Sequence, residues 1–540
     1  MKIAGLWSGH DCSFYVSDSG RPVVHAEYER YIREKEPAGD SAQFLLDEYD
    51  ESDEIVYFAT CLPDSKLKSH DKSYEKISEI ATKNGGNIFV IGHHQAHAAN
   101  AFFSSNFENS LVVTIDGGGI EAPGQASAFT VWQGSGNNIS HLHTFPIQEI
   151  NIGGVWTRAT RYIFKLQSGW PRGHQAGSVM AMAALGDASR FTQDFLKMLT
   201  RDVNEASHKP PNQPRGAYTG DDPKHPYLEY WAEIASRSEQ DRYDVAAGLQ
   251  RATELFLKNV LGNLITSTKS EYLCLSGGVS LNSVAVGKIV EWFPQIKGIY
   301  VPPTPHDGGL PIGAAQYAWH QILDNPRITW DDNYTPYLGF TYGEAHVAAA
   351  IQSRSGELVA FPGNDDEVVD LLSEGNIIAV FGGGSESGRR ALGNRSILAD
   401  PRGENMKDTI NEKVKHRQWY RPFAPSILRE EVKNWFKYDF DSPYMSMVLP
   451  FKDDVKSKVP AVVHVDGTAR LQTVTEKDNK WYYNFIKKWY KNTNVPIVLN
   501  TSFNDREPIC ETADHAIDCF LRTNIDYLYF YDQNILVRKK

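Results

Sequence analysis

The sequence predicts an α/β protein of two domains. Strand-like apolar runs alternate with segments of helical periodicity along most of the chain. With 540 residues, of which 41% are hydrophobic, the chain is well beyond the size of ~250–300 residues at which a single core stops growing. Two folded domains are therefore expected, and we place them at residues 1–340 and 341–540.

The first domain opens with a predicted β-hairpin. Ile3 to Trp7 and Ser13 to Val16 are apolar runs, and Asp18-Ser19-Gly20 predicts a turn into a further strand from Pro22 to Glu27. More strands are expected at Glu54–Ala59, Asn87–Ile91, Leu111–Ile115, Ala128–Trp132, Tyr272–Leu275 and Gly298–Val301, and helices at His94–Phe103, Val155–Leu166, Ser178–Leu185, Ala246–Ile265 and Ile312–Leu323. A hairpin followed by mixed strands and helices fits the duplicated ribonuclease-H-like cores of the actin, hexokinase and Hsp70 class.

The second domain continues the alternation after a break. Lys209–Lys224, rich in proline and glycine, predicts an exposed excursion, and Asn325–Tyr337 predicts a linker. Beyond it we expect strands at Glu357–Phe361, Ile377–Phe381, Pro496–Leu499 and Asp526–Tyr531, and helices at Asp366–Ser373 and Trp481–Tyr490.

Composition excludes several classes of function. The N-terminus has no basic segment followed by an apolar stretch, and no run of about 18 apolar residues occurs, so we expect no membrane span and a cytoplasmic protein. The five cysteines form no CxxC pair, which argues against a disulfide framework or a structural zinc site. The net charge of −12 argues against a large basic surface for nucleic acid but leaves a local groove open.

A metal site is predicted by histidine spacing. His93 and His97, at i and i+4, project from one face of a helix, as a pair of ligands must. Asp116 ends an apolar strand before Gly117-Gly118-Gly119, and Asp307 begins a second Asp-Gly-Gly corner. Two imidazoles and two carboxylates suit a divalent metal with open positions. An isolated HxxxH is more often a plain helix face, but the two corners favour the metal site.

Two further features suggest contacts with phosphate and with a hydroxyl. Ser276-Gly277-Gly278 to Asn282 follows a strand and precedes an amphipathic helix, where a glycine turn can hold phosphate, although such a turn alone is weak evidence. His10 comes directly after the first strand and could accept a proton from a hydroxyl near neutral pH. Without further support, a structural histidine is the preferred interpretation of His10.

Arginines recur in apolar and glycine-rich parts of the second domain. They are Arg389, Arg390, Arg395, Arg417, Arg421 and Arg470, with Lys415 among them. Converging guanidinium groups bind phosphate and carboxylate bidentately, which predicts a site for a small phosphate ester. A solvated charged face is less probable, because Ala391 to Gly393 and Pro422 to Pro425 do not resemble exposed surface.

A set of motifs in order resembles the carbamoyltransferase family that includes nodulation, cephamycin, novobiocin and tobramycin carbamoyltransferases. The resemblance covers nearly the whole chain. Its N-terminal strings are Gly9-His10-Asp11, Glu29-Arg30, His93 to Ala98, Asp116-Gly117-Gly118, Ser276 to Asn282 and Asp307-Gly308. Its C-terminal strings are Glu386, Arg390 to Leu398, Asn411, Lys415, Arg421 to Pro425, His464 to Arg470 and Asn500 to Asn504.

The resemblance implies an ATP-dependent O-carbamoyltransferase. The first domain would resemble the tRNA threonylcarbamoyl transferases and the second the YrdC threonylcarbamoyl-adenylate synthases. The second would form carbamoyl-adenylate from carbamoyl phosphate and ATP, and the first would pass the carbamoyl group to an acceptor hydroxyl. Iron, or another divalent metal such as Mg²⁺, is the implied metal.

The resemblance also implies roles for individual residues. His93, His97, Asp116 and Asp307 would bind the metal, and His10 would activate the acceptor. Lys415 and Arg421 would act on the carbamoyl donor. The residues that would bind substrate and nucleotide are Arg390, Arg395, Arg470, Asn500 and Ser502 in the second domain and Gly117, Gly118, Gly277, Gly278 and Asn282 in the first. Gly384, Arg389 and Ser178 depart from the family pattern, which puts local contacts in doubt.

The acceptor is left open by the sequence. A small natural product or a sugar is one candidate, and a hydroxymethylated base in DNA is another, since Lys480–Lys491 is an aromatic and basic segment. An amphipathic helix that buries Trp481, Phe485 and Trp489 is the preferred interpretation of that segment. A non-catalytic nucleotide sensor and a hydrogenase-maturation protein are the alternatives, although paired CxxC motifs are missing. A homodimer is also left open.

Overall fold

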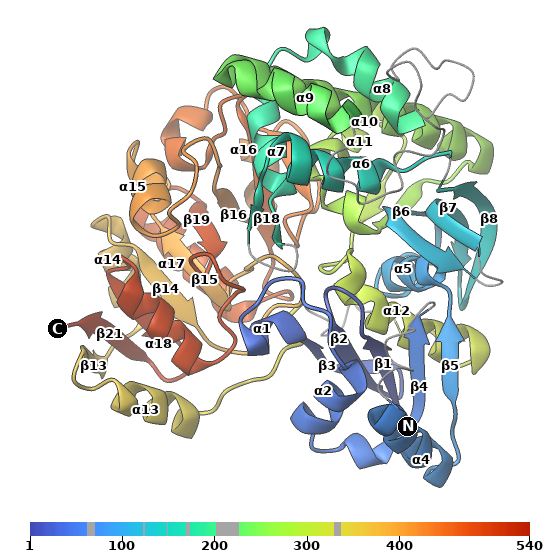
Figure 1. Cartoon of the computed structure of the whole chain (residues 1–540). Coiled ribbons are helices and arrows are strands. Elements are labelled where there is room, and N and C mark those ends of the chain that lie inside the picture. Colours follow the sequence, from blue (N-terminus) through green and yellow to red (C-terminus); the bar gives the residue numbers. More distant parts are fainter. Residues whose placement is uncertain (62–70, 122–124, 148, 169–172, 201–225, 329–335) are drawn as a thin grey trace. The chain divides into compact units, whose positions relative to one another are not determined.

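The computed structural model describes the chain outside residues 62–70, 122–124, 148, 169–172, 201–225 and 329–335 (Figure 1). The chain forms two compact units. The first unit comprises Met1–Val23 and Lys35–Thr329, and the second comprises Val24–Glu34 and Trp330–Lys540. The second unit is therefore discontinuous in sequence, which the local pattern does not predict. The predicted excursion and part of the predicted linker lie outside the described residues.

The N-terminal part of the chain forms a five-stranded sheet in the order β3-β2-β1-β4-β5, and its edge strand β3 runs from the first unit into the second. Its strands are β1 (Lys2–Trp7), β2 (Ser13–Asp18), β3 (Arg21–Glu27), β4 (Ile55–Cys61) and β5 (Ile88–Ile91). The central strand β1 is antiparallel to β2 and parallel to β4, and β4 is parallel to β5. The predicted opening hairpin is confirmed.

A second five-stranded sheet repeats this arrangement in the order β12-β11-β6-β7-β8. Its strands are β6 (Asn109–Glu121), β7 (Gln125–Ser135), β8 (Asn138–Pro146), β11 (Tyr272–Ser276) and β12 (Gly298–Tyr300). The central strand β6 is antiparallel to β7 and parallel to β11, and β11 is parallel to β12. Two sheets with the same order and directions constitute the duplicated ribonuclease-H-like fold that the sequence predicts.

Helix α12 (Leu310–Tyr317) packs tightly between β1 and α5 (His93–Phe103). A Cβ atom on Gly5 would lie 1.8 Å from the carbonyl oxygen of Pro311, and one on Gly313 would lie 1.8 Å from that of Ala96. Only glycine permits backbones to approach so closely. The contact fixes α5, and the histidines that it carries, against the first sheet.

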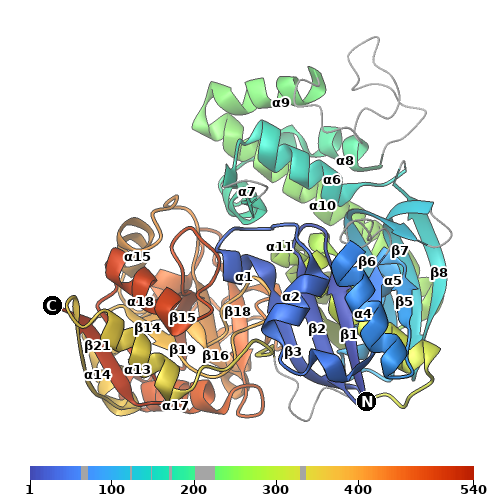
Figure 2. The ribbon, with the colours of Figure 1, turned by 60° about the horizontal axis from the view of Figure 1, so that its bottom comes forward.

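Some of the other helices of the first unit lie at predicted positions, at 152–158, 176–183, 239–268 and 283–292, and the rest lie in segments where no helix was predicted. Together these helices are α2 (Ser41–Glu48), α4 (Asp71–Lys83), α6 (Ile152–Arg158), α7 (Ala176–Ala183), α8 (Thr192–Thr200), α9 (Pro226–Arg237), α10 (Glu239–Thr268) and α11 (Ser283–Trp292). The single helix predicted at Val155–Leu166 is instead α6 followed by a π-helical turn, Ala159–Ile163. Figure 2 shows α6, α8, α9 and α10 gathered in one helical layer.

The second unit is built on a nine-stranded sheet in the order β13-β21-β20-β14-β15-β19-β16-β18-β17. Its strands are β13 (Leu358–Pro362), β14 (Ile378–Phe381), β15 (Arg395–Ala399), β16 (Ala424–Leu428), β17 (Met447–Pro450), β18 (Thr468–Val474), β19 (Ile497–Ser502), β20 (Tyr527–Phe530) and β21 (Ile535–Lys539). Its helices are α1 (Tyr28–Ile32), α13 (Glu344–Ser353), α14 (Asp365–Ser373), α15 (Met406–Lys413), α16 (Val432–Trp435), α17 (Lys480–Thr493) and α18 (Ala513–Arg522).

Helix α17 is amphipathic, as preferred from its sequence. Tyr482, Phe485 and Trp489 are fully buried against the central strands and α14. Trp481 is partly buried and stacks on Tyr531 with ring centroids 3.8 Å apart. The aromatic rings of this segment therefore belong to the core. No helix in the described part of the chain is long and apolar enough to cross a membrane.

Buried charged side chains connect the segment Val24–Glu34 to the rest of the second unit through ion pairs and hydrogen bonds. Arg30 is 2% exposed and donates a hydrogen bond of 2.7 Å to the carbonyl oxygen of Gly388. Its guanidinium lies 3.0 Å from the carboxylate of Glu27 and 3.6 Å from that of Glu511. Glu27 accepts from the backbone N–H of Gly388 at 2.9 Å. This network fixes the loop between β14 and β15 at Gly388.

Candidate active site

Four predicted metal ligands come together in the first unit. His93 and His97 lie on the first turns of α5, Asp116 lies within β6, and Asp307 begins the 3-10 turn before α12. His93, His97 and Asp307 are buried, and Asp116 is partly exposed. Their ligand atoms all lie within 4.8 Å of one another.

Asp116 does not end its strand, which corrects the sequence prediction. Strand β6 continues to Glu121, and its pairing with β7 shifts register between Ile115 and Gly119. A Cβ on Gly119 would lie 2.2 Å from the imidazole of His93. The glycines thus leave room for the histidine and turn Asp116 toward it, because a bulge in one strand redirects its side chains.

The geometry of the four side chains fits a divalent metal. His93 Nε2 lies 3.1 Å from Asp116 Oδ2 and 3.6 Å from Asp307 Oδ1, and His97 Nε2 lies 3.6 and 3.4 Å from the same two oxygens. Among the described residues, His97 Nε2 is buried without a hydrogen-bond partner. Two imidazole nitrogens and two carboxylate oxygens are a donor set for Fe²⁺, Mn²⁺ or Zn²⁺.

Neighbouring groups form hydrogen bonds that orient the metal-binding side chains. Ser276 Oγ lies 3.4 Å from His97 Nδ1, and the N–H of Gly278 donates to Asp116 Oδ1 at 2.9 Å. Such contacts typically fix the tautomer and direction of metal-binding groups. The glycine turn after β11 therefore supports the carboxylate of Asp116.

Electrostatics in the group are set by the two carboxylates. Burial disfavours the charged imidazole of His97, but Asp116 and Asp307 outweigh this effect and raise its pKa to about 9. Burial likewise opposes ionisation of Asp116, yet His93 and His97 hold the pKa of its carboxyl well below the usual range. A positive charge between the carboxylates is thus favoured.

His94 has a different environment. It bonds to Thr114 Oγ1 at 2.7 Å and to the carbonyl oxygen of Ser127 at 3.0 Å. Burial, with the charges of His93 and His97, lowers its pKa to about 3. His94 is therefore a neutral structural residue.

His10 lies at the edge of the same group. Its side chain is 52% exposed, its Nδ1 lies 2.9 Å from Asp11 and its Nε2 lies 3.3 Å from Asp307 Oδ2. Partial desolvation by the surrounding protein opposes protonation, but Asp307 and Asp11 raise the pKa of His10 to about 10. A cation on Asp307 would weaken this attraction and lower the pKa of His10, which favours the neutral imidazole that a base requires.

Asn282 does not point a free amide toward a ligand. Its Oδ1 accepts from the N–H of Ala285 and so caps α11, and its amide exchanges hydrogen bonds of 3.0 and 3.2 Å with Gln250. Gly277 has a φ of +86°, and a Cβ there would lie 2.3 Å from the carbonyl oxygen of Ile115. The turn is thus shaped by contacts within the first unit, and Asn282 has a structural role.

Four arginines of the second unit converge. Arg390 lies in the loop after β14, Arg417 and Arg421 in the loop after α15, and Arg470 in β18. Burial and the charges of Arg470, Arg389 and Arg421 hold the pKa of Arg390 well below its usual range. Burial, with Arg421 and Arg417, lowers the pKa of Arg470 to about 10. We call Arg390, Arg417, Arg421 and Arg470 the arginine cluster.

The arginine cluster lacks compensating carboxylates. Within the described residues, no ion pair joins its members to Asp or Glu, and Arg470 Nε is buried without a hydrogen-bond partner. Mutual repulsion makes this arrangement costly without an anion. The arrangement therefore favours the binding of an anion.

Arg395 is separate from the arginine cluster, contrary to the role that the sequence suggested. It is fully buried and donates to the carbonyl oxygens of Gly382 at 2.6 Å, Asn394 at 3.0 Å and Glu511 at 3.3 Å. Its guanidinium also lies 3.7 Å from the centre of the Phe381 ring. These contacts consume its donors, so Arg395 stabilises the loop between β14 and β15.

Glu386 organises that loop and was not singled out as a site residue from the sequence. Its Oε1 accepts from the N–H groups of Leu392 at 2.7 Å, Asn394 at 2.9 Å and Arg395 at 3.2 Å. A lone carboxylate in a glycine-rich segment was the available signal. The turn that it holds presents Arg390 to the other arginines.

Lys415 and Asn500 also support the loops around the arginine cluster. Lys415 Nζ donates to the carbonyl oxygens of Ser502 at 2.6 Å and Asn504 at 2.7 Å, and to Asn504 Oδ1 at 2.7 Å. Buried Asn500 donates to the carbonyl oxygen of Ala391 at 3.1 Å. Lys415 and Asn500 thus hold the backbone of the neighbouring loops in place. The Ser502 hydroxyl donates a hydrogen bond to Asn504 Oδ1.

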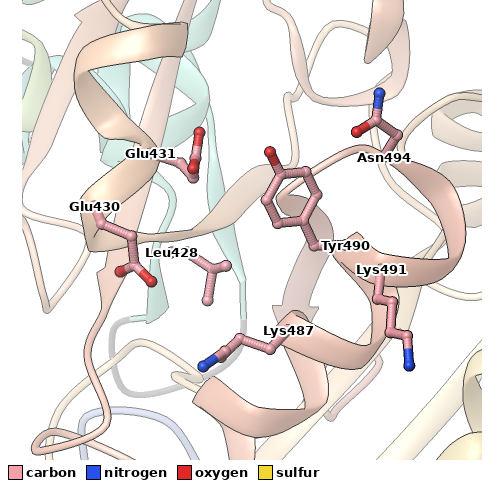
Figure 3. Close-up of a pocket in the computed structure, with 7 residues that line it drawn as sticks. All are labelled: Leu428, Glu430, Glu431, Lys487, Tyr490, Lys491 and Asn494. Atoms are coloured by element: carbon pink, nitrogen blue, oxygen red, sulfur yellow. The ribbon is translucent and has the colours of Figure 1, made fainter.

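A groove elsewhere in the second unit combines opposite charges. Figure 3 shows Leu428, Glu430 and Glu431 on one side and Tyr490, Lys491 and Asn494 on the other. Glu430 and Glu431 lie across the groove from Lys487 and Lys491, and their negative charges would repel a nucleic-acid phosphate backbone. This groove and the buried rings of α17 remove the signal for DNA binding in this segment.

A second group of metal-binding residue types comes together at Glu507, Cys510 and Cys519. Glu507 already forms an ion pair with Arg522 and lies 3.8 Å from Arg33. Cys510 donates to the carbonyl oxygen of His515. Its compensated charge makes this group a poor metal site.

Two family models and several curated proteins match the chain. The model described as Carbamoyltransferase N-terminus matches residues 64–316, and that described as Carbamoyltransferase C-terminus matches residues 369–539. Nodulation protein NolO of Bradyrhizobium diazoefficiens is 35% identical over 461 residues, which cover 83% of this chain and 79% of that protein. The 3'-hydroxymethylcephem-O-carbamoyltransferase of Amycolatopsis lactamdurans is 29% identical over 343 residues, covering 63% of this chain and 61% of that protein.

Proposed function

The chain belongs to the carbamoyltransferase family, and from this premise we propose that it is an ATP-dependent O-carbamoyltransferase that uses carbamoyl phosphate. The observation that carries the proposal is the arginine cluster. Its partly buried, uncompensated charges match a substrate pair in which both partners carry phosphate. A protein that only senses nucleotide would not need the second unit's anion site together with the histidine and aspartate group of the first.

The second unit is proposed to make the activated carbamoyl group. Carbamoyl phosphate would yield carbamate and phosphate by hydrolysis, and a carbamate oxygen would attack the α-phosphorus of ATP as pyrophosphate leaves. Arg390, Arg421 and Arg470 would bind the phosphate oxygens and stabilise charge that grows in the transition state. The YrdC-like character of this unit and the carbamoyl-adenylate intermediate are both parts of the proposal.

The first unit is proposed to transfer the carbamoyl group. The acceptor oxygen would attack the carbamoyl carbon, with AMP as the leaving group, while His10 accepts the hydroxyl proton and Asp11 orients the imidazole. His93, His97, Asp116 and Asp307 would hold a divalent metal, with iron as first choice, and this ion would supply charge stabilisation for the departing phosphate.

A hydroxyl on a small molecule is the proposed acceptor. The cephem relative is named for carbamoylation of a hydroxymethyl group on a small molecule. The aromatic segment that suggested DNA is instead part of the core, since Phe485 and Trp489 are fully buried. These observations favour a small-molecule hydroxyl over a base in DNA.

The proposed function is tested with labelled substrate. Purified protein with ATP, Mg²⁺ and ¹⁴C-carbamoyl phosphate is expected to release pyrophosphate and to label hydroxyl acceptors from a panel of sugars and hydroxymethyl compounds. Hydroxymethylcytosine DNA is included in the panel. Absence of pyrophosphate release that depends on carbamoyl phosphate would contradict the adenylate route, and efficient labelling of DNA would contradict the choice of acceptor.

Metal binding is expected to depend on pH. The pKa of His97 is raised to about 9, so an incoming cation must displace a proton at neutral pH. The affinity should rise with pH between 6 and 8, by about tenfold per pH unit for each proton released, and level off once His97 is neutral in the free protein. Titration of chelator-treated protein with Fe²⁺ or Mn²⁺ at several pH values measures this slope.

Elemental analysis supplies the control for the ligand assignment. One metal ion per chain is expected in the native protein and in His141→Ala, which changes an exposed histidine of the same unit. The double variant His93→Ala/Asp307→Ala should lose it. Full metal content in the double variant, or affinity independent of pH, would refute the site.

A further inference from the structure

Trp419 is an exposed aromatic side chain between two members of the arginine cluster. It is 53% exposed, whereas large aromatic side chains are usually mostly buried. Arg417 and Arg421 flank it at two residues on either side. Two residues span at most about 7 Å, so the backbone of Arg417, Trp419 and Arg421 lies in one short stretch of the loop.

Helix α15 holds the loop that carries Trp419 in place. Asn411 Oδ1 accepts from Arg417 Nε at 2.8 Å, and Asn411 Nδ2 donates to the carbonyl oxygens of Trp419 at 3.5 Å and Arg421 at 3.3 Å. One residue of α15 thus positions all three. The loop is held in place while the indole remains accessible.

A further cation lies over the indole. Lys407 precedes Asn411 by one helical turn, and its Nζ lies 5.9 Å from the centre of the Trp419 ring. Residues i and i+4 lie on the same helix face. The indole therefore lies beside the face of α15 that carries Lys407 and Asn411, and Asn411 in turn accepts a hydrogen bond from Arg417.

We propose that Trp419 stacks on the base of the nucleotide whose phosphates bind the arginine cluster. An exposed ring beside Lys407, in the loop that carries two arginines of the cluster, matches a ligand with a flat aromatic part and a negatively charged part, which describes a nucleoside triphosphate. Carbamoyl phosphate has no ring and gains nothing from the indole. Trp419 thus lets the cluster distinguish ATP from other phosphates. The inference rests on the proposed function.

The test separates the base from the phosphates. Trp419→Ala should raise the KM for ATP in pyrophosphate release by roughly 5- to 150-fold, because stacking on an aromatic ring contributes that much to affinity. The KM for carbamoyl phosphate should not change. Trp419→Phe should restore most of the ATP affinity. Tripolyphosphate, which has no base, should inhibit the native protein and Trp419→Ala equally.

Controls distinguish a failure of the stacking role of Trp419 from a failure of the proposed carbamoyltransferase function. Tyr230→Ala changes another side chain with 53% exposure, on α9 of the first unit, and should leave the KM for ATP unchanged. An unchanged KM for ATP in Trp419→Ala, with the native protein active, would overturn the stacking role alone. A rise in the KM for the acceptor instead would assign Trp419 to the acceptor and also overturn it. An inactive native protein would overturn the proposed function, and equilibrium dialysis of ATP would then still report on Trp419.

Discussion

Replacing Arg470 with alanine is expected to reduce carbamoyl phosphate-dependent pyrophosphate release by roughly 10²- to 10³-fold, the usual effect of removing one donor to a reacting oxyanion. Arg470 lies in β18 among partly buried arginines, and its Nε has no hydrogen-bond partner among the described residues. The loss should appear without any acceptor. Pyrophosphate measured in a coupled assay gives the rate.

Thermal unfolding distinguishes a binding role of Arg470 from a structural one. Burial lowers the pKa of Arg470, and the charges of Arg421 and Arg417 lower it further, so removal of Arg470 relieves repulsion and should not lower Tm. Phosphate should raise the Tm of the native protein more than that of Arg470→Ala. Arg395→Ala, by contrast, should lower stability by roughly 2–5 kcal/mol, because carbonyl oxygens such as that of Gly382 lose their donor.

An arginine outside the cluster provides a matched control. Arg429 pairs with Asp439 and Asp441 on the surface of the same unit. Arg429→Ala should keep full pyrophosphate release, since exposed ion pairs contribute little. Normal adenylate formation in a folded Arg470→Ala would rule out the phosphate role of the cluster.

His10→Ala is expected to separate the two half-reactions. A base that deprotonates the acceptor has no part in forming the adenylate, so pyrophosphate release should persist in this variant. Transfer to the acceptor should fall by about 10²–10⁴-fold, the typical contribution of general base catalysis. Labelled product and pyrophosphate are measured on one preparation.

The metal content of the variant decides whether His10 acts as a base or as a metal ligand. Its Nε2 lies 3.3 Å from Asp307, so a loss of metal in His10→Ala would also reduce transfer. The metal content of His10→Ala should equal that of the native protein. Loss of pyrophosphate release, or of the metal, would contradict the role of His10 as base.

Local patterns predicted most of the elements but not every role. The alternation of apolar runs located strands such as β1, β6 and β11, and helical spacing identified the buried face of α17. The spacing of His93 and His97 brought both onto one helix face. These features depend on residues close in sequence, which is why the sequence alone predicts them.

Features that depend on distant residues were missed. Arg395 resembles its cluster neighbours in sequence, and only the folded loop shows that Gly382 and Glu511 consume its donors. Asp116 resembled a strand end because Gly117-Gly118-Gly119 is a common turn signal, whereas pairing with β7 carries the strand onward. Tertiary contacts decide both outcomes.

The interrupted second unit determines how the protein can be divided. A fragment that starts at residue 330 would lack Glu27 and Arg30, and Glu511 and the backbone of Gly388 would lose their buried partners. Gly388 adjoins the part of the loop that carries Arg390. Separate expression of the two halves should therefore give a C-terminal half with a poorly formed anion site. A fusion that supplies residues 24–34 in cis, by circular permutation, is the form in which this half could be studied alone.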